Sequence, residues 1–197
     1  MSERMSFCPI FAIMVTSLAV VTAASAEIQF DEGQWRLELS GGTGVHSGST
    51  DRSSNLLVQA AVEYEFPATP RCTLGLRLLP IFVYDQEDDL ETDAWRDHDR
   101  YKGDRVCGAG FGVTGRVYQV KEKYRGFFTE AEVLAVAHKD LIDGNSSKLN
   151  FLTGVGVGYK CKADWHVVFK YEHISNASLG RHNAGANSLG IGIGYTF

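Results

Sequence analysis

The sequence predicts an all-β protein, an eight-stranded antiparallel transmembrane β-barrel of the bacterial outer membrane. Three observations predict this class. The chain opens on a segment with the parts of an export signal. The remainder holds no run of about 20 apolar residues that could form a membrane-spanning helix. From Gly33 onward, segments of about ten residues alternate between an apolar face and a polar or small face, which is the period of a strand.

The export signal is expected to occupy residues 1–26. Arg4 lies in a short polar head, an apolar run follows from Phe7 to Val21, and the triplet Ala24-Ser25-Ala26 supplies the small residues of a cleavage site. We expect cleavage before Glu27. Residues 27–197 would then form a single β-barrel domain.

The alternation is clearest at the end of the chain, where no helix would produce the pattern. There Leu189, Ile191, Ile193, Tyr195 and Phe197 alternate with Ser188, Gly190, Gly192, Gly194 and Thr196. The same test predicts seven further strands, whose outward sets are Trp165/Val167/Phe169/Tyr171, Phe151/Thr153/Val155/Val157/Tyr159, Phe127/Ala131/Val133/Ala135, Ala109/Phe111/Val113/Val117, Leu74/Leu76/Leu78/Phe82, Leu56/Val58/Ala60/Val62/Tyr64 and Trp35/Leu37/Leu39. Pro80 lies inside one of these strands, where its missing N–H predicts a bulge.

The opposite faces of the predicted strands carry charges of both signs among many glycines: Arg36, Glu38, Gln59, Glu63, Glu65, Arg77, Arg116, Glu130, Glu132, Lys170 and Glu172. A soluble ligand-carrying barrel would turn its apolar face inward and its charges outward. The charged, glycine-rich face instead favours a lipid-embedded barrel with a polar interior. Aromatic residues near the strand ends, Trp35, Tyr64, Tyr159, Trp165 and Tyr195, suit interfacial girdles.

Connection lengths orient the predicted barrel. The turns at residues 67–71, 120–125 and 160–164 are short, whereas those at 46–55, 85–104, 138–147 and 177–187 are longer. Outer-membrane barrels have short periplasmic turns and long outer loops, so both termini are expected on the periplasmic side. The acidic loop 85–104 is interpreted as solvated, with cation binding as the alternative.

The charge and the cysteines exclude several function classes. The net charge of −5 argues against a nucleic-acid partner. Cys72, Cys107 and Cys161 lack metal-ligand spacing and do not form a disulfide framework, although one pair stays open. We interpret the histidines in or beside the outer loops as surface residues: His46, His98, His138 and His182. No metal or other cofactor is expected.

Polar residues interrupt the outward apolar series of one predicted strand. After Trp165, Val167, Phe169 and Tyr171 the same face continues into His173 and Ser175, near the outer rim. A membrane face disfavours unpaired polar groups, so this pair suggests a function. Imidazole could take the proton of the Ser175 hydroxyl while the oxygen attacks a carbonyl, although the bare His-x-Ser spacing is common.

The neighbouring residues carry a family resemblance. The run His173-Ile174-Ser175-Asn176-Ala177, then Asn183-Ala184-Gly185 and a closing strand ending in Phe197, resembles the C-terminal signature of the PagL-type lipid A 3-O-deacylases. The resemblance in motif covers roughly the last 30 residues. It implies an eight-stranded outer-membrane barrel that removes an acyl chain from lipid A of lipopolysaccharide in the outer leaflet.

Applied to this chain, the resemblance implies that Ser175 is the nucleophile and His173 the general base. It implies that Asn176 positions the site or stabilises the oxyanion, and that Asn183 and Gly185 shape the adjacent loop. It also implies that the assembly machinery of the outer membrane recognises Phe197. The sequence leaves open whether the barrel forms a homodimer.

The sequence departs from the family pattern at one position. Well-studied members of the family carry a Glu in the last strand, and the position that aligns here is Asn187, with no acid after Glu172. Asn187 could hold the tautomer of His173 but lacks a charge to stabilise imidazolium. A loop acid such as Asp140 or Asp143 is an alternative source of that charge. A non-catalytic barrel with a structural or binding role is therefore the alternative function.

Overall fold

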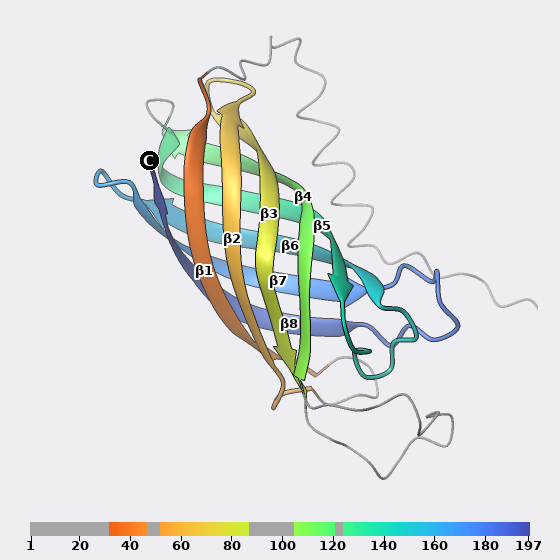
Figure 1. Cartoon of the computed structure of the whole chain (residues 1–197). Helices are drawn as coiled ribbons and strands as arrows, with labels where there is room; N and C mark the ends of the chain where they lie inside the picture. Colours follow the sequence, from red (N-terminus) through yellow and green to blue (C-terminus); the bar gives the residue numbers. More distant parts are fainter. Residues whose placement is uncertain (1–31, 47–51, 87–104, 121–123) are drawn as a thin grey trace, which may run out of the picture.

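Eight antiparallel strands close into one barrel in the computed structural model, which describes residues 32–46, 52–86, 105–120 and 124–197. The predicted export signal therefore lies outside the described residues, as does His98. The strands are β1 (Gln34–Gly44), β2 (Leu56–Pro67), β3 (Cys72–Asp85), β4 (Arg105–Val120), β5 (Arg125–His138), β6 (Leu149–Lys160), β7 (Trp165–Ser175) and β8 (Ala186–Thr196). Each pairs with the next in sequence, and β1 pairs with β8 to close the barrel (Figure 1). The predicted fold class is confirmed.

Short and long connections lie at opposite ends of the barrel. β2–β3, β4–β5 and β6–β7 are joined by segments 68–71, 121–124 and 161–164, whereas segments 45–55, 86–104, 139–148 and 176–185 are longer. The chain end lies beside a short connection, where Thr196 N–H donates to the Asp164 carbonyl at 3.0 Å (Figure 1). The loops β5–β6 and β7–β8 emerge together at the other end, which we call the outer end.

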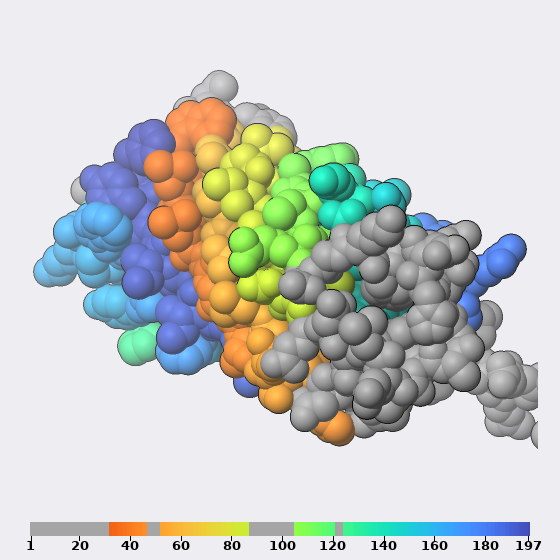
Figure 2. Space-filling view, turned by 60° about the horizontal axis from the view of Figure 1, so that its bottom comes forward, coloured from red at the N-terminus to blue at the C-terminus, as the bar shows by residue number. Residues whose placement is uncertain are grey.

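The two faces of the wall have opposite character. Outward side chains such as Phe111 and Leu39 are each 69% exposed, whereas the inward Arg36 is 0% exposed. In the space-filling view the side chains of β1, β2, β3 and β4 form adjoining bands across one side of the barrel (Figure 2). An apolar exterior around a charged interior inverts the pattern of soluble barrels and matches a lipid environment. No helix in the described ranges is long and apolar enough to cross a membrane.

The predicted bulge in β3 is confirmed, and it overturns one assignment. The register shifts between Leu79 and Phe82 against β4, and between Leu78 and Ile81 against β2. Pro80 and Ile81 are both exposed, so the alternation resumes one residue out of step. Phe82, expected outward, therefore faces the interior and is 1% exposed. The missing N–H of proline and the extra residue of a bulge together cause this change.

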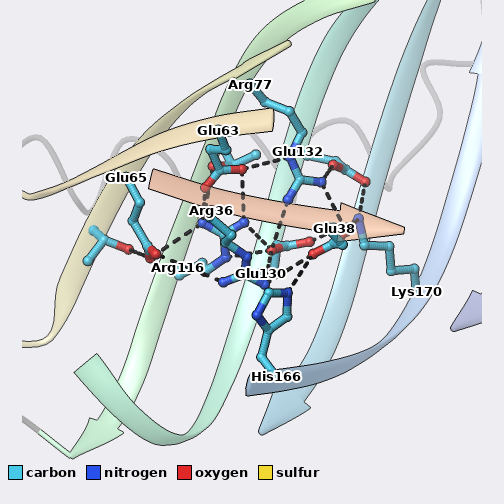
Figure 3. Close-up of polar contacts among 12 residues, drawn as sticks. Arg36, Glu38, Glu63, Glu65, Arg77, Arg116, Glu130, Glu132, His166 and Lys170 are labelled. Atoms are coloured by element: carbon cyan, nitrogen blue, oxygen red, sulfur yellow. Dashed lines mark hydrogen bonds and ion pairs between the residues drawn. The ribbon is translucent and has the colours of Figure 1, made fainter. Parts of the chain in front are cut away.

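Ion pairs fill the middle of the interior (Figure 3). Arg116 Nη2 contacts Glu130 Oε2 at 2.5 Å and Arg116 also pairs with Glu63, while Lys170 Nζ contacts Glu38 Oε1 at 2.7 Å. These side chains are at most 2% exposed. Buried charges persist only when paired and hydrogen-bonded, and strands from opposite sides of the narrow barrel supply both signs. The predicted polar interior is confirmed for this layer.

Toward the outer end the interior becomes apolar, which the alternating charges did not predict. The buried cluster there consists of Leu57, Ala61, Leu79, Phe82, Tyr84, Val106, Leu134, Val136, Ile142, Leu152, Ile174 and Ala186. It lies between the ion pairs and the long loops. The bulge enlarges this cluster because it directs the Phe82 side chain inward.

The predicted aromatic residues lie at one end only. Trp35 contacts Tyr64 and Trp165 contacts Tyr195, with ring centroids 5.1 and 5.3 Å apart. Tyr159 packs edge-on against Phe127 at 5.1 Å. All lie near the short connections, so they form one belt at that end.

The three cysteines that the structure describes, Cys72, Cys107 and Cys161, are unpaired.

Candidate active site

A hydrogen-bonded histidine lies on the outer surface near the outer end. His173 on β7 stands opposite Asn187 on β8 in the strand register, and its Nδ1 lies 2.6 Å from Asn187 Oδ1. Both belong to the outward face, because Tyr171 and Leu189 two residues below are outward. Asn187 is only 9% exposed although it faces outward, since His173 is beside it.

This contact determines which nitrogen of His173 can act as a base. An amide oxygen only accepts hydrogen bonds. Nδ1 must therefore carry a hydrogen and donate a hydrogen bond to Asn187 Oδ1. In the neutral imidazole the other nitrogen, Nε2, is then unprotonated and can accept a proton. The predicted role of Asn187 as the partner of the imidazole agrees with this geometry.

Ser175 is the last residue of β7 and lies on the same face as His173. Two residues along a strand span about 6.6 Å, so the two side chains are neighbours. Both are partly exposed. No hydrogen bond joins Ser175 Oγ to His173 among the contacts of the described residues. Such bonds are often long in unliganded sites and tighten when substrate binds.

Gly185 lies against the imidazole ring from the side of β8. Its φ is +63°, a conformation that L side chains rarely adopt. A Cβ at this position would come within 2.9 Å of His173 Cε1. The glycine that the sequence predicted to shape the loop therefore allows the backbone to approach the base.

A strained turn follows Ser175 directly. The Leu179 N–H donates to the Asn176 carbonyl at 2.9 Å, and the two residues between, Ala177 and Ser178, have φ values of 50° and 64°. Positive φ at both central positions defines a type I′ turn, which usually needs Asn or Gly there. Neither residue is of that kind, so the surrounding contacts must hold the turn.

Asn176 is the residue that holds this turn. Its Oδ1 accepts from Ser178 N at 2.9 Å, and its Nδ2 donates to the His182 carbonyl at 2.8 Å. Its backbone N–H donates to Asn183 Oδ1 at 3.0 Å. The side chain is 0% exposed and points away from the exterior. Of the two roles expected for Asn176, its contacts favour positioning over direct contact with an oxyanion.

A chain of buried amides connects Asn176 to the neighbouring hairpin. Asn176 Nδ2 donates to Asn145 Oδ1 at 2.7 Å, and Asn145 Nδ2 donates to Asn150 Oδ1 at 2.7 Å. Asn150 Nδ2 then lies 2.5 Å from His138 Nε2. His138, expected at the surface, is therefore buried, at 7% exposed, because it points into the mouth of the barrel. His46 and His182 are exposed as expected.

The sequence did not single out Asn145 or Asn150. Asn145 lies in the β5–β6 connection, where no periodic pattern distinguishes an inward from an outward side chain. Asn150 is the second residue of β6, where alternation turns it inward but does not indicate its partner. Their burial depends on how two loops dock, which is a tertiary event. The one sequence feature that could have pointed to these residues is the number of asparagines in the two segments beside Ser175.

The predicted alternative acids do not reach the base. The backbone carbonyl of Asp140 contacts His138 Nδ1 at 2.5 Å, and that of Asp143 accepts from Arg52 Nη2 at 2.7 Å. Neither carboxylate is hydrogen-bonded or ion-paired to His173 in the described loops. Glu172 faces the interior and accepts from Gln59 Nε2 at 2.8 Å, as its position in the alternation predicted.

Comparison with known proteins now identifies the family. The sequence profile of the lipid A 3-O-deacylase (PagL) family matches residues 84–196, more than half of the chain. The chain belongs to this family. The matched range contains His173, Ser175 and Asn187, so the resemblance read from the motif is confirmed. None of the curated proteins compared with the chain matches it.

One solved structure shares the fold, and two others resemble it less closely. The crystal structure of the outer membrane enzyme PagL matches with a TM-score of 0.57 at 17% identity, over 81% of this chain and 98% of that one. Neisserial surface protein A matches at 10% identity over 87% of this chain and 99% of that one, with a TM-score of 0.49. The N-terminal β-barrel domain of Pseudomonas aeruginosa OprF matches at 11% identity over 87% of this chain and 100% of that one, also with a TM-score of 0.49.

Family membership and the apolar exterior together place this chain in the outer membrane as a β-barrel. Within the described part of the chain, no group of three or more His, Cys, Asp or Glu side chains could hold a metal ion. The donors near His173 are amides, hydroxyls and backbone groups. This arrangement suits proton transfer and nucleophilic attack.

Proposed function

We propose that this PagL-family barrel is a serine esterase that removes the ester-linked 3-O acyl chain from lipid A of lipopolysaccharide. The observation that carries the proposal is the hydrogen bond from His173 Nδ1 to Asn187, with Ser175 next along the same outward face. It leaves Nε2 of the imidazole free to act as a base. Family membership supplies the substrate class.

The residues support a two-step acyl transfer. His173 Nε2 takes the proton of Ser175 as Oγ attacks the ester carbonyl, and the carbon–oxygen bond to the sugar then breaks. The sugar oxygen leaves as a hydroxyl by taking the proton from His173. Water, activated by His173 in turn, cleaves the acyl-serine and releases the fatty acid. Gly185 lies against the His173 ring, and its backbone is a candidate to help stabilise the oxyanion.

The position of the pair on the barrel fits a lipid substrate. His173 and Ser175 lie on the exterior of the wall near the outer end, directly above the apolar side chains of Tyr171 and Leu189. A lipid in the outer leaflet would place its acyl chains along this apolar wall and its ester groups near the rim. A hydrolase with this design needs no cavity in the barrel.

Mass spectrometry of lipid A tests the proposal. Incubation with the purified barrel in detergent is expected to release one hydroxyacyl chain, and Ser175→Ala is expected to abolish the release because no nucleophile remains. Thr129→Ala, which removes another exposed hydroxyl of the wall, is the matched control and should leave activity unchanged. Equal lipid A profiles with native chain and Ser175→Ala would contradict the proposal.

A non-catalytic barrel is the second candidate, and Asn187 is the observation that favours it. In a serine protease, changing the acid of the triad to its amide lowers the rate by about 10⁴-fold. Asn187 orients His173 but brings no charge to stabilise the imidazolium that forms during attack. On this alternative the site is a remnant, and the barrel acts through its wall or loops.

A further inference from the structure

We propose that Asn145, on the β5–β6 loop, is a positioning residue for the nucleophile Ser175 and acts through Asn176. The inference rests on the proposed function and extends it to a second hairpin. Asn145 is 2% exposed, so it cannot touch a lipid substrate. Its effect on the reaction would pass through the residue that follows Ser175 in the chain.

The amides form a chain with one direction. Asn176 donates to Asn145, and Asn145 donates to Asn150, each through Nδ2 to Oδ1 at 2.7 Å. Asn150 Nδ2 lies 2.5 Å from His138 Nε2, which must accept because His138 Nδ1 faces the carbonyl of Asp140. Each member thus fixes the orientation of the next, and Asn145 is the link between the two hairpins.

Backbone contacts join the same two loops beside this chain. Asn145 and Asn183 form an isolated antiparallel bridge, in which Ser146 N donates to the His182 carbonyl at 3.1 Å and Ala184 N donates to the Gly144 carbonyl at 2.9 Å. Asn183 in turn accepts from Asn176 N through its side chain at 3.0 Å. The segment from Ser175 to Gly185 is therefore held from outside its own hairpin.

The strained turn explains why such support is needed. Ala177 and Ser178 both adopt positive φ immediately after Ser175, a conformation that persists only where surrounding contacts over-determine it. Asn176 supplies those contacts, and Asn145 fixes the side chain of Asn176. If Asn145 were apolar, Asn176 would lose an acceptor in a buried place and the turn could relax. Relaxation would shift Ser175 relative to His173.

The test compares two substitutions of Asn145. Asn145→Leu removes, at similar volume, the three hydrogen bonds that the Asn145 side chain makes with Asn150, Asn176 and the Ser147 N–H. It is expected to lower kcat about 10²-fold with KM little changed, since a misplacement of about 1 Å has this effect on a reacting group. Asn145→Asp loses the donor to Asn150 but keeps the acceptor for Asn176 and Ser147 N, and it is expected to restore kcat to within about tenfold of the native value. Rescue by Asn145→Asp distinguishes positioning from a general loss of stability.

Asn55→Leu is the matched control. Asn55 is also a buried amide at the outer end, at 6% exposed, and its Nδ2 donates to Tyr84 Oη at 2.7 Å. It lies one residue before β2, and its Nδ2 contact is with Tyr84 on β3. Its substitution should leave kcat unchanged. Hydrogen–deuterium exchange should rise in peptides covering 176–184 in Asn145→Leu and remain native there in Asn55→Leu.

The variants are made in the native chain and in the Asn187→Glu background, which supplies a carboxylate beside His173. Two results in an active enzyme overturn this inference alone. In the first, Asn145→Leu leaves kcat unaffected; in the second, Asn145→Leu and Asn145→Asp lower kcat equally. Absence of deacylation in both backgrounds overturns the proposed function together with it. A selective loss in Asn145→Leu, with rescue and with faster exchange at 176–184, supports it.

Discussion

At the scale of single residues, the site is defined by what each side chain can donate or accept. Asn187 accepts from His173 Nδ1, which leaves Nε2 available as the base of the proposed reaction. Gly185 makes room for the imidazole, since any Cβ there would meet Cε1 at 2.9 Å. The amide differs from the carboxylate of the well-studied family members by one charge. In the proposed mechanism, the deacylation rate depends on that charge.

Asn187→Glu is expected to raise the deacylation rate, by up to about 10⁴-fold, because a carboxylate keeps the tautomer of His173 and stabilises imidazolium. The measurement is kcat for release of the hydroxyacyl chain from lipid A. Asn187→Gln, which keeps the amide at the same length as Glu, is the control for side-chain size. Activity in Asn187→Glu but none in the native chain would establish the non-catalytic alternative for the native protein, and a rate lower than native would contradict the role given to Asn187.

At the scale of elements, the bulge in β3 decides which side chains enter the interior. Strict alternation from Leu74 places Phe82 on the lipid side, whereas the register shift at Pro80 and Ile81 turns it inward. The apolar cluster beneath the outer loops therefore includes Phe82. That cluster lies under the β7–β8 corner through Ile174 and Ala186, the neighbours of His173 and Asn187 in the two strands.

Phe82→Ala is expected to lower the free energy of unfolding by about 3–5 kcal/mol, because it leaves a cavity in the buried cluster. Ile81→Ala, one residue away and 51% exposed, should cost less than half as much. Urea unfolding of the refolded barrel in detergent, followed by tryptophan fluorescence, measures both. A larger loss for Ile81→Ala would mean that the register of β3 follows unbroken alternation.

At the scale of the whole molecule, ion pairs across the interior tie strands from opposite sides together. Arg116 on β4 contacts Glu63 on β2 and Glu130 on β5, and Arg77 on β3 contacts Glu132 at 2.5 Å. Lys170 on β7 reaches Glu38 on β1. Arg116 and Glu130 are opposite each other on the paired strands β4 and β5, whereas the other contacts join strands that share no backbone ladder. The side chains converge in the interior (Figure 3). The closed wall therefore has an internal framework beneath the candidate active site.

Arg116→Met is expected to destabilise the barrel by about 3–5 kcal/mol, since it removes the cation and leaves Glu63 and Glu130 as buried carboxylates with fewer partners. Arg105→Met is the control: its side chain is 65% exposed and pairs with Asp85 at 3.3 Å, so its loss should cost less than about 1 kcal/mol. Guanidinium unfolding in the same detergent compares the two. Equal losses would show that burial of the Arg116 pairs has no energetic consequence.

The sequence by itself determined the barrel, its strand number and the placement of His173 and Ser175 on the outward face. Side chains of a strand alternate with a period of two, so local order alone assigns each residue to a face. It also determined that Asn187 stands where the family carries an acid, because the motif fixes the position along the last strand.

Only the tertiary structure decided the rest. The inward position of Phe82 depends on a bulge whose exact step alternation does not specify, and the burial of His138 depends on where the end of β5 meets the mouth of the barrel. Asn145 and Asn176 lie 31 positions apart and meet only because two loops dock. Contacts between loops leave no periodic trace in a sequence, since they arise from closure of the whole barrel rather than from the preferences of neighbouring residues.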